Sequence, residues 1–238
     1  MRTRLAAAIT LVVVALLVAV GLASSGQAAP PPASPAKARA ARPGQVVTVR
    51  TASSRATVAV LEVWARTATG YTRVAGPWTA RVGRNGVGRV HEGSGRTPAG
   101  VWPLGTGFGV GTRDPGSHLG WFTAGSRDWW GSDVRSPSTY NRHVRCRRAS
   151  CPFRTAHAEH LADYASAYRY AMLIGYNTPP HVRVGAGSAF FLHVGTGGPT
   201  AGCVSLPASR VVWLLRRMKP SAVVSIGVGS AAYAPLHA

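Results

Sequence analysis

A cysteine and a histidine stand ten residues apart in a glycine-rich segment, and both can take part in acyl transfer. His193 follows the apolar run 188–192, and Cys203 comes directly after Gly202. A cysteine attacks a carbonyl carbon as its thiolate, so it needs a base or a cation nearby. An imidazole can accept the thiol proton and stabilise the thiolate as imidazolium. We therefore predict that Cys203 is a nucleophile and that His193 is its general base.

The backbone beside the cysteine predicts an oxyanion site. Gly202 allows close approach of a substrate, and the amides of Gly202 and Cys203 can point at a developing oxyanion. One such donor typically contributes about 10²–10³ in rate. The alternative is that Cys203 is a small buried residue of the core and His193 a core histidine. The glycine and turn residues around Cys203 favour the catalytic interpretation.

The N-terminus has the residue order of an export signal. Arg2 and Arg4 precede the apolar run 5–23, and small residues follow as far as Ala28. This order is typical of a secretory signal, but the run is also long enough to cross a bilayer as a helix. We predict that 1–28 is a signal peptide or an N-terminal anchor, and that the protein acts outside the cytoplasmic membrane. The Pro/Ala-rich residues 29–45 predict a disordered tether, and 46–238 predict one domain.

The chain has three cysteines, and an odd number in an exported protein indicates one free thiol. Cys146 and Cys151 are close in sequence, and a disulfide between them would contribute roughly 2 kcal/mol in the chain-entropy model. Cys203 would then be the free thiol. A metal site at the paired cysteines would have only His143 as another local ligand, so we predict no metal there.

The formal net charge is +20, and all but two of the 27 basic residues are arginine. A basic protein attracts polyanions, which outside a bacterium include anionic wall polymers; the export signal argues against nucleic acid as the partner. An arginine cluster near the cysteine pair could hold carboxylates or phosphates, or could simply be a solvated face: Arg142, Arg145, Arg147, Arg148 and Arg154.

The apolar patterns predict a mainly β fold with one or two helices. Strands are expected at 58–64, 168–176, 188–194 and 223–228. Asn85-Gly86 predicts a hairpin turn between 80–82 and 87–90. A helix is expected to begin at Pro207 and end before Pro220, and another is possible at 155–167. The stretch 105–141 shows no period and predicts a long loop or lid.

Several segments, in this order, resemble the L,D-transpeptidase catalytic domain, and in particular its actinobacterial-type branch. The family is marked by a histidine on a strand followed by a Ser/Thr-His-Gly-Cys segment, which correspond here to His193 and to 200–203. An upstream Thr-Pro-x-Gly-x-aromatic mark is present at 97–102. The chain departs from the family in four ways: Ala201 replaces the second histidine, Ser205 replaces an Asn or Arg, the loop 194–202 is short, and Val194 stands where many members have glycine.

The resemblance implies a sandwich-like β fold and a cofactor-free reaction on peptidoglycan stem peptides. Cys203 would displace D-Ala from a tetrapeptide stem, and an amine of a second stem would take the acyl group in a 3→3 cross-link. Water as acceptor would make the protein a carboxypeptidase, and a non-catalytic cell-wall-binding module is the main alternative. Expected substrate contacts are Tyr176, Asn177, Thr200 and Ser205, although the first two could merely end a strand.

Overall fold

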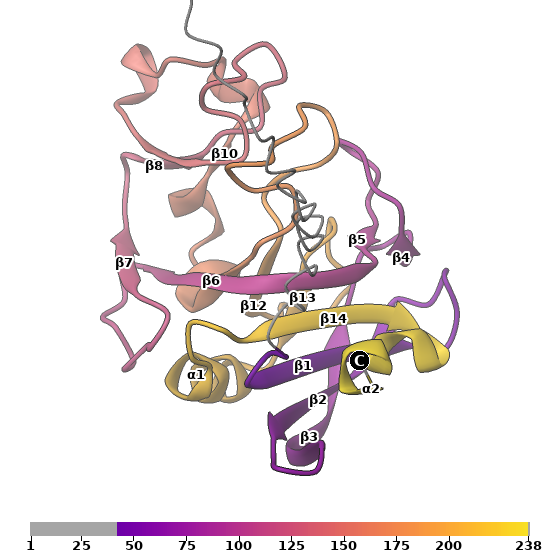
Figure 1. Cartoon of the computed structure of the whole chain (residues 1–238). Helices are drawn as coiled ribbons and strands as arrows, with labels where there is room; N and C mark the ends of the chain where they lie inside the picture. The colour runs from indigo at the N-terminus through magenta and orange to yellow at the C-terminus, as the bar shows by residue number, and fades with distance from the viewer. Residues whose placement is uncertain (1–41, 238) are drawn as a thin grey trace, which may run out of the picture. The chain divides into compact units, whose positions relative to one another are not determined.

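One sheet of nine strands forms most of the structure, a computed structural model that describes residues 42–237 (Figure 1). The predicted signal or anchor at 1–28, and most of the tether 29–45, lie outside the described residues. The main sheet has the strand order β11-β12-β13-β3-β2-β1-β14-β6-β7. The predicted mainly β, sandwich-like fold is confirmed at this level. Its strands are β1 (Gln45–Thr51), β2 (Val58–Arg66), β3 (Tyr71–Arg81), β6 (Gly100–Val110), β7 (Trp121–Ala124), β11 (Ala171–Ile174), β12 (Phe191–Val194), β13 (Val204–Leu206) and β14 (Val223–Val228).

Smaller elements extend from this sheet. A three-stranded sheet has the order β10-β8-β9, and β4 pairs with β5 in parallel. Within residues 42–237, no helix is long and apolar enough to cross a membrane. The remaining elements are β4 (Val87–Gly88), β5 (Thr97–Pro98), β8 (Asp128–Trp130), β9 (His143–Arg145), β10 (Glu159–His160), α1 (Ala208–Arg217), α2 (Ala234–His237) and the 3₁₀ turns η1 (Arg148–Ser150), η2 (Thr155–His157), η3 (Leu161–Tyr164), η4 (Ala167–Arg169) and η5 (Gly229–Tyr233).

The main sheet closes on itself at β11. This strand pairs antiparallel with β12, where Ala171 is opposite His193, and also with β6, where Ala171 is opposite Phe108. Figure 1 shows β6 as a long strand, with β14 and β1 on one side of it and the segment that carries β8 and β10 on the other. Closure places β11 between the histidine strand β12 and β6, which begins about 90 residues before β12 in the chain.

The parallel pairing of β12 with β13 separates two hydrophobic cores. Leu192 lies opposite Val204, and both belong to the larger core cluster. Side chains alternate between the two faces of a strand, so the neighbours of Leu192 point to the other face. There Phe191 and Cys203 join a second cluster, which is rich in aromatic residues. The cysteine therefore belongs to the face that also carries His193.

Helix α1 confirms the helix expected from Pro207. Pro207 is the N-cap, with extended backbone angles, and the helix ends where the Met218 amide donates to the Leu214 carbonyl. Its buried residues include Val211, Leu214 and Leu215, which join the larger core at the three- and four-residue spacing of one helix face. The strands expected at 58–64, 168–176, 188–194 and 223–228 are also confirmed, as β2, β11, β12 and β14.

Two element predictions for the middle of the chain are wrong. Residues 155–167 do not form one helix, because Glu159 pairs with Trp130 on β8 and splits the segment into 3₁₀ turns. The stretch 105–141 is not a single loop, because it contains most of β6 and all of β7 and β8. Glycines in β6 hid the strand pattern: a Cβ on Gly109 would lie 2.8 Å from the ring of Trp121. Glycine is needed there because neighbouring groups occupy the space of a side chain.

The Asn85-Gly86 segment turns the chain but does not join a hairpin, so that prediction is also wrong. Gly86 has a φ of 77°, and its amide donates to the Gly83 carbonyl. Residues 87–88 pair with Thr97–Pro98 instead of with 80–82. The turn packs against the backbone of Ser54, which would lie 2.1 Å from a Cβ at position 86. Tertiary contacts thus redirect the chain after a locally favoured turn.

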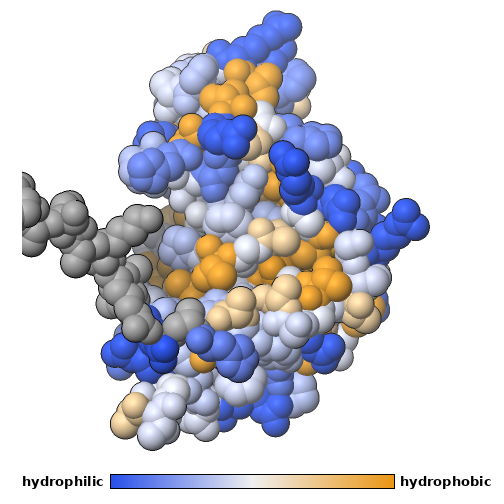
Figure 2. Space-filling model, turned by 45° about the vertical axis from the view of Figure 1, so that its right-hand side comes forward, coloured by the Kyte–Doolittle hydropathy of each residue, from blue (hydrophilic) through white to orange (hydrophobic). Residues whose placement is uncertain are grey.

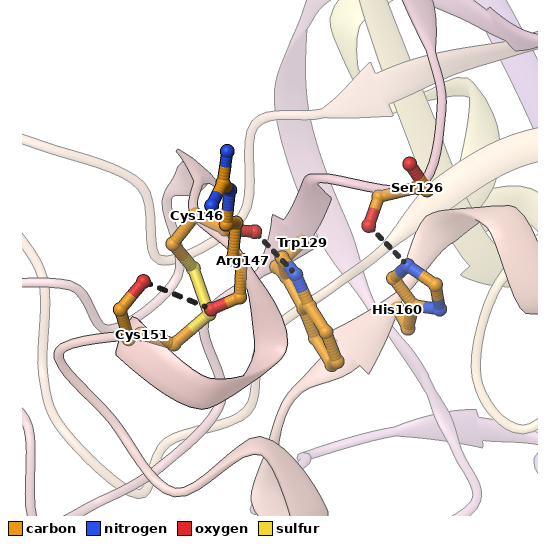
Figure 3. Close-up of a disulfide and its surroundings, with 7 residues drawn as sticks. Ser126, Trp129, Cys146, Arg147, Cys151 and His160 are labelled. Atoms are coloured by element: carbon orange, nitrogen blue, oxygen red, sulfur yellow. Dashed lines mark hydrogen bonds between the residues drawn. A yellow bond between two sulfur atoms is a disulfide. The ribbon is translucent and has the colours of Figure 1, made fainter.

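The disulfide between Cys146 and Cys151 is present, as predicted, with a Cα–Cα distance of 5.1 Å. Figure 3 shows it beside Trp129, whose indole Nε1 donates to the Cys146 carbonyl oxygen at 3.3 Å. The same ring stacks on His160, which contacts the Ser126 carbonyl. The Cys146 carbonyl therefore links the disulfide-closed, arginine-rich segment to the buried Trp129.

The cysteine assignment predicts that the oxidised, unfolded protein has one titratable thiol, that of Cys203. Reduction before titration should raise the number to three, because the disulfide accounts for the other two cysteines. Thiol titration in denaturant, with and without reductant, measures both values. Three thiols without reductant would contradict the pairing.

Candidate active site

The Cys203 thiol is held between two backbone groups, one at the first residue of β12 and one just before that strand. Its sulfur accepts the Phe191 amide hydrogen at an N–Sγ distance of 3.3 Å, and the thiol donates to the Ala189 carbonyl oxygen at 3.4 Å. Cys203 is 7% exposed. Burial, reinforced by the charge of Glu159, raises the pKa of the thiol, and the Phe191 amide opposes this in part. The thiol is therefore neutral at rest.

The His193 imidazole is oriented by its own strand. Its Nδ1 lies 2.8 Å from the Val194 carbonyl oxygen. A carbonyl only accepts hydrogen bonds, so Nδ1 carries the proton of the neutral ring and Nε2 is left basic. Burial lowers the pKa of His193, and the Val194 carbonyl opposes that shift in part. The ring is thus a neutral base near pH 7, as the predicted role requires.

The structure brings both predicted catalytic residues to one cavity. A cavity of about 400 Å³ is lined by Cys203 and His193, together with Thr200 and Ser205. The pairing of His193 with Ser205 in the β12–β13 ladder explains this, because it places the histidine two residues along from the cysteine on a shared face. Among the described residues, however, no hydrogen bond joins Cys203 to His193. The thiol instead hydrogen-bonds to Ala189.

The two amides predicted for an oxyanion site are not equivalent. The Gly202 amide donates to Thr200 Oγ1 at 3.1 Å, and that hydroxyl donates to the Cys203 carbonyl at 2.7 Å. Thr200 therefore closes a small turn in front of the cysteine. In the part of the chain that the structure describes, the Cys203 amide has no hydrogen-bond partner, so it alone is available to an oxyanion in this conformation.

The other predicted substrate contacts divide into two groups. Thr200 and Ser205 line the thiol cavity, and the buried Ser205 hydroxyl has no partner among residues 42–237. Tyr176 and Asn177 do not line it. The Tyr176 hydroxyl donates to the Ala186 carbonyl, and Asn177 makes hydrogen bonds to Arg183 and Gly187. These two residues secure the loop 183–187, so the structure places them away from the thiol.

Asn141 is a site residue that sequence reasoning missed. Its Oδ1 accepts from Trp130 Nε1 at 2.8 Å and from the Ala189 amide at 3.1 Å, and its Nδ2 donates to the Tyr176 and Asn177 carbonyls. Both Asn141 and Ala189 have left-handed backbone angles, with φ of 53° and 56°. Asn141 thus holds in place the residue whose carbonyl receives the thiol.

Glu159 and Tyr168 form a second missed feature. Both line the thiol cavity, and the Tyr168 hydroxyl donates to Glu159 Oε1. Burial raises the pKa of Glu159 to about 7, against the lowering effect of the Tyr168 hydrogen bond. The Tyr168 ring also packs edge-on against His193, at 5.4 Å between centroids. The tyrosine therefore contacts both the carboxyl and the imidazole at the cavity.

Much of the predicted arginine cluster is engaged within the protein. Arg154 forms a two-pronged ion pair with Asp133, Arg145 lies 3.3 Å from Asp128, and Arg148 covers the ring of Trp129. Arg142 and Arg147 are exposed. On the face shown in Figure 2, hydrophilic side chains project around a central area of apolar surface. The arginines of this cluster therefore help to fix the segment as well as carry charge.

Within residues 42–237, no group of three or more histidine, cysteine, aspartate or glutamate residues is placed to hold a metal ion. A scan against models of known protein families finds no match to the chain, and a search of curated proteins finds no similar sequence.

The Asn141 contacts predict a large loss of stability on Asn141→Ala, roughly 3–5 kcal/mol, because buried carbonyl and amide groups lose their partners and alanine is strained at a φ of 53°. Urea unfolding measures the change. Asn85→Ala is the matched control, since Asn85 makes one exposed side-chain hydrogen bond, and should cost less than about 1 kcal/mol. Equal effects of the two substitutions would contradict the role of Asn141.

The raised pKa of Glu159 predicts that Glu159→Gln stabilises the protein at alkaline pH. The folded state favours the protonated carboxyl, so this group's contribution is complete below its unfolded pKa of about 4.5 and is lost as the pH rises through about 7. The variant should match the wild type near pH 4 and exceed it by on the order of 1–3 kcal/mol at pH 8. Urea unfolding at both pH values tests this, and a variant that is less stable at pH 8 would contradict it.

Proposed function

We propose that the chain is an exported cysteine acyltransferase that acts on peptidoglycan stem peptides as an L,D-transpeptidase. The observation that supports this most directly is a free thiol that shares a cavity with an imidazole whose basic nitrogen is Nε2. The proposed substrate, a peptidoglycan stem peptide, follows from the family resemblance of segments 97–102 and 193–203. The +20 net charge suits an environment of wall carboxylates and phosphates.

The proposed first half-reaction joins the acyl group of a donor stem to Cys203. The thiol leaves the Ala189 carbonyl and passes its proton to His193 Nε2, directly or through one water. Sulfur attacks the carbonyl carbon before D-Ala, and the Cys203 amide supports the oxyanion. The C–N bond then breaks, and the D-Ala amine departs with the proton held by His193.

The proposed second half-reaction passes the acyl group to an amine of a second stem, which gives a 3→3 cross-link. With water as acceptor the same enzyme would be a carboxypeptidase. Burial favours the neutral forms of both Cys203 and His193, so the thiolate forms only when His193 takes the proton. No step requires a metal or a cofactor.

Export is part of the proposal. It depends on the signal-like residues 1–28, and the Cys146–Cys151 disulfide supports it because disulfides persist mainly in oxidising compartments. Cleavage of this segment would release the domain, and retention would tether it at the membrane.

A non-catalytic cell-wall-binding module is the second candidate function. The observation that favours it is the resting thiol, which hydrogen-bonds to Ala189 and lacks a hydrogen bond to His193 among the described residues. Intact-mass measurement after incubation with a carbapenem separates the two candidates. A transpeptidase gains the mass of the acylating compound at Cys203, whereas a binding module gains none.

We predict that Cys203→Ala abolishes acylation and release of D-Ala from tetrapeptide stems, while the protein stays folded. His193→Ala should slow acylation by about 10²–10⁴ because the general base is lost, and His193→Gln should be nearly as slow, because an amide cannot take the proton. The exposed His181 offers a control, and His181→Ala should react as fast as wild type. Continued D-Ala release by Cys203→Ala would overturn the nucleophile assignment.

The lowered pKa of His193 also predicts the pH dependence of acylation. The imidazole must be neutral to accept the thiol proton, so the rate falls only when the pH drops below the pKa of His193, which is below 6.5. Carbapenem acylation rates measured by mass spectrometry between pH 5 and 8 test this. The acid limb should be absent in His193→Gln, and an unchanged acid limb in that variant would assign it to another group.

A further inference from the structure

Glu159 is a carboxylate at the thiol that the two half-reactions above do not use. Its Oε1 accepts the Tyr168 hydroxyl. Its Oε2 has no hydrogen-bond partner among the described residues, and the residue lines the cavity that holds the thiol. No ion pair to Glu159 occurs within residues 42–237. Burying a carboxylate without a neighbouring cation costs free energy. The position of Glu159 beside the Cys203 thiol therefore calls for a functional explanation.

Two cavities meet at this carboxylate. The cavity of about 400 Å³ contains His193, and a second cavity of about 210 Å³ does not. Glu159 and Cys203 line both. A ligand that reaches the thiol through the smaller cavity therefore meets Glu159 and not His193, because the histidine does not line that cavity.

The charges of the smaller cavity favour an amine. Glu92 and Glu159 both line it, and they are two of only three glutamates in a chain with 27 basic and 7 acidic residues. The cavity is also lined by Arg84, His91, Tyr168 and Cys203. In a protein so short of acidic side chains, two carboxyls at one small cavity provide a local attraction for an ammonium group.

This inference rests on the proposed function. We propose that Glu159 is a catalytic residue of the second half-reaction: Glu159 binds the acceptor's primary amine and takes its proton as that amine attacks the Cys203 thioester. The bound ammonium first releases one proton to water, which leaves the neutral amine as the nucleophile. The new C–N bond then forms, the C–S bond breaks, and a second proton of the nitrogen passes to Glu159 Oε2. The departing sulfur takes this proton back, which restores the free thiol and the carboxylate. In this scheme His193 is the base for the donor half-reaction, and Glu159 is the base for the acceptor half-reaction.

The electrostatics of the pair suit this order of events. A charged Glu159 opposes ionisation of Cys203, because two negative charges would share one buried site. The thioester sulfur of the acyl-enzyme cannot ionise, so no thiolate charge opposes the carboxylate in that state. With its pKa raised to about 7, Glu159 can take a proton and return it at neutral pH.

The test separates acylation from transfer in the full chain. Carbapenem acylation of Cys203, followed by intact mass, reports the first half-reaction. The second half-reaction is measured with a tetrapeptide stem that ends in D-Ala and serves as both donor and acceptor. The readout is the ratio of cross-linked dimer to hydrolysed tripeptide. Glu159→Gln should acylate within about threefold of wild type, and its dimer-to-tripeptide ratio should fall at least about tenfold.

Two further variants exclude a purely structural effect. Glu159→Asp keeps a carboxylate one methylene further back and should retain a ratio between those of wild type and Glu159→Gln. Glu62→Gln changes the remaining glutamate, which bonds to Arg73 and Tyr233 away from the thiol cavities, and should leave the ratio unchanged. Thermal unfolding checks that each variant is folded.

The outcomes distinguish this inference from the proposed function. If the wild type is acylated and Glu159→Gln keeps a dimer-to-tripeptide ratio within twofold of it, the role of Glu159 alone is overturned. Equal ratios in the Asp and Gln variants also overturn it, since the carboxylate would then not matter. A wild-type chain that is never acylated overturns the proposed function and this inference together.

Discussion

The site depends on the parallel register between β12 and β13. Leu192 and Val204 lie opposite each other in this ladder, and both side chains belong to the larger core. Strand alternation then sends Cys203 and His193 to the opposite face. A slip of one residue in either strand would bury the polar groups in the aliphatic core. The burial of Leu192 and Val204 therefore places the thiol and the imidazole on the same face of the sheet.

Backbone hydrogen bonds, more than ion pairs, hold the reactive groups in place. The thiol lies between the Phe191 amide and the Ala189 carbonyl, and the imidazole is oriented by the Val194 carbonyl. Asn141 in turn fixes the left-handed Ala189. Backbone groups of a well-packed sheet are already ordered, so using them to orient side chains adds little entropic cost.

Burial gives the site its chemical character. It raises the pKa of the thiol, lowers that of the imidazole and raises that of Glu159, so each shift favours the neutral form. A neutral thiol and a neutral imidazole avoid unpaired buried charge at these two groups in an otherwise strongly basic protein. Charge then has to develop during the reaction, when substrate groups and the Cys203 amide can offset it.

The sequence by itself determined the local features of this protein. Apolar runs located β2, β12 and β14, Pro207 marked the start of α1, and the Cys146–Cys151 spacing indicated the disulfide. The shared cavity of Cys203 and His193 was also foreseeable, because both lie in one short segment between a strand and a helix. Such features depend on periodicity and short-range spacing, which a sequence displays directly.

Only the tertiary structure decided the rest. Glu159 and Asn141 reach the site through pairing between distant segments, and neither stands in a local pattern that marks it. The helix expected at 155–167 gave way to 3₁₀ turns and β10, since pairing with β8 outweighed helical propensity. The glycines of β6 concealed a strand, because their purpose is to admit the rings of other elements. Long-range packing leaves no periodic signal in the sequence, so these features were not predictable from it.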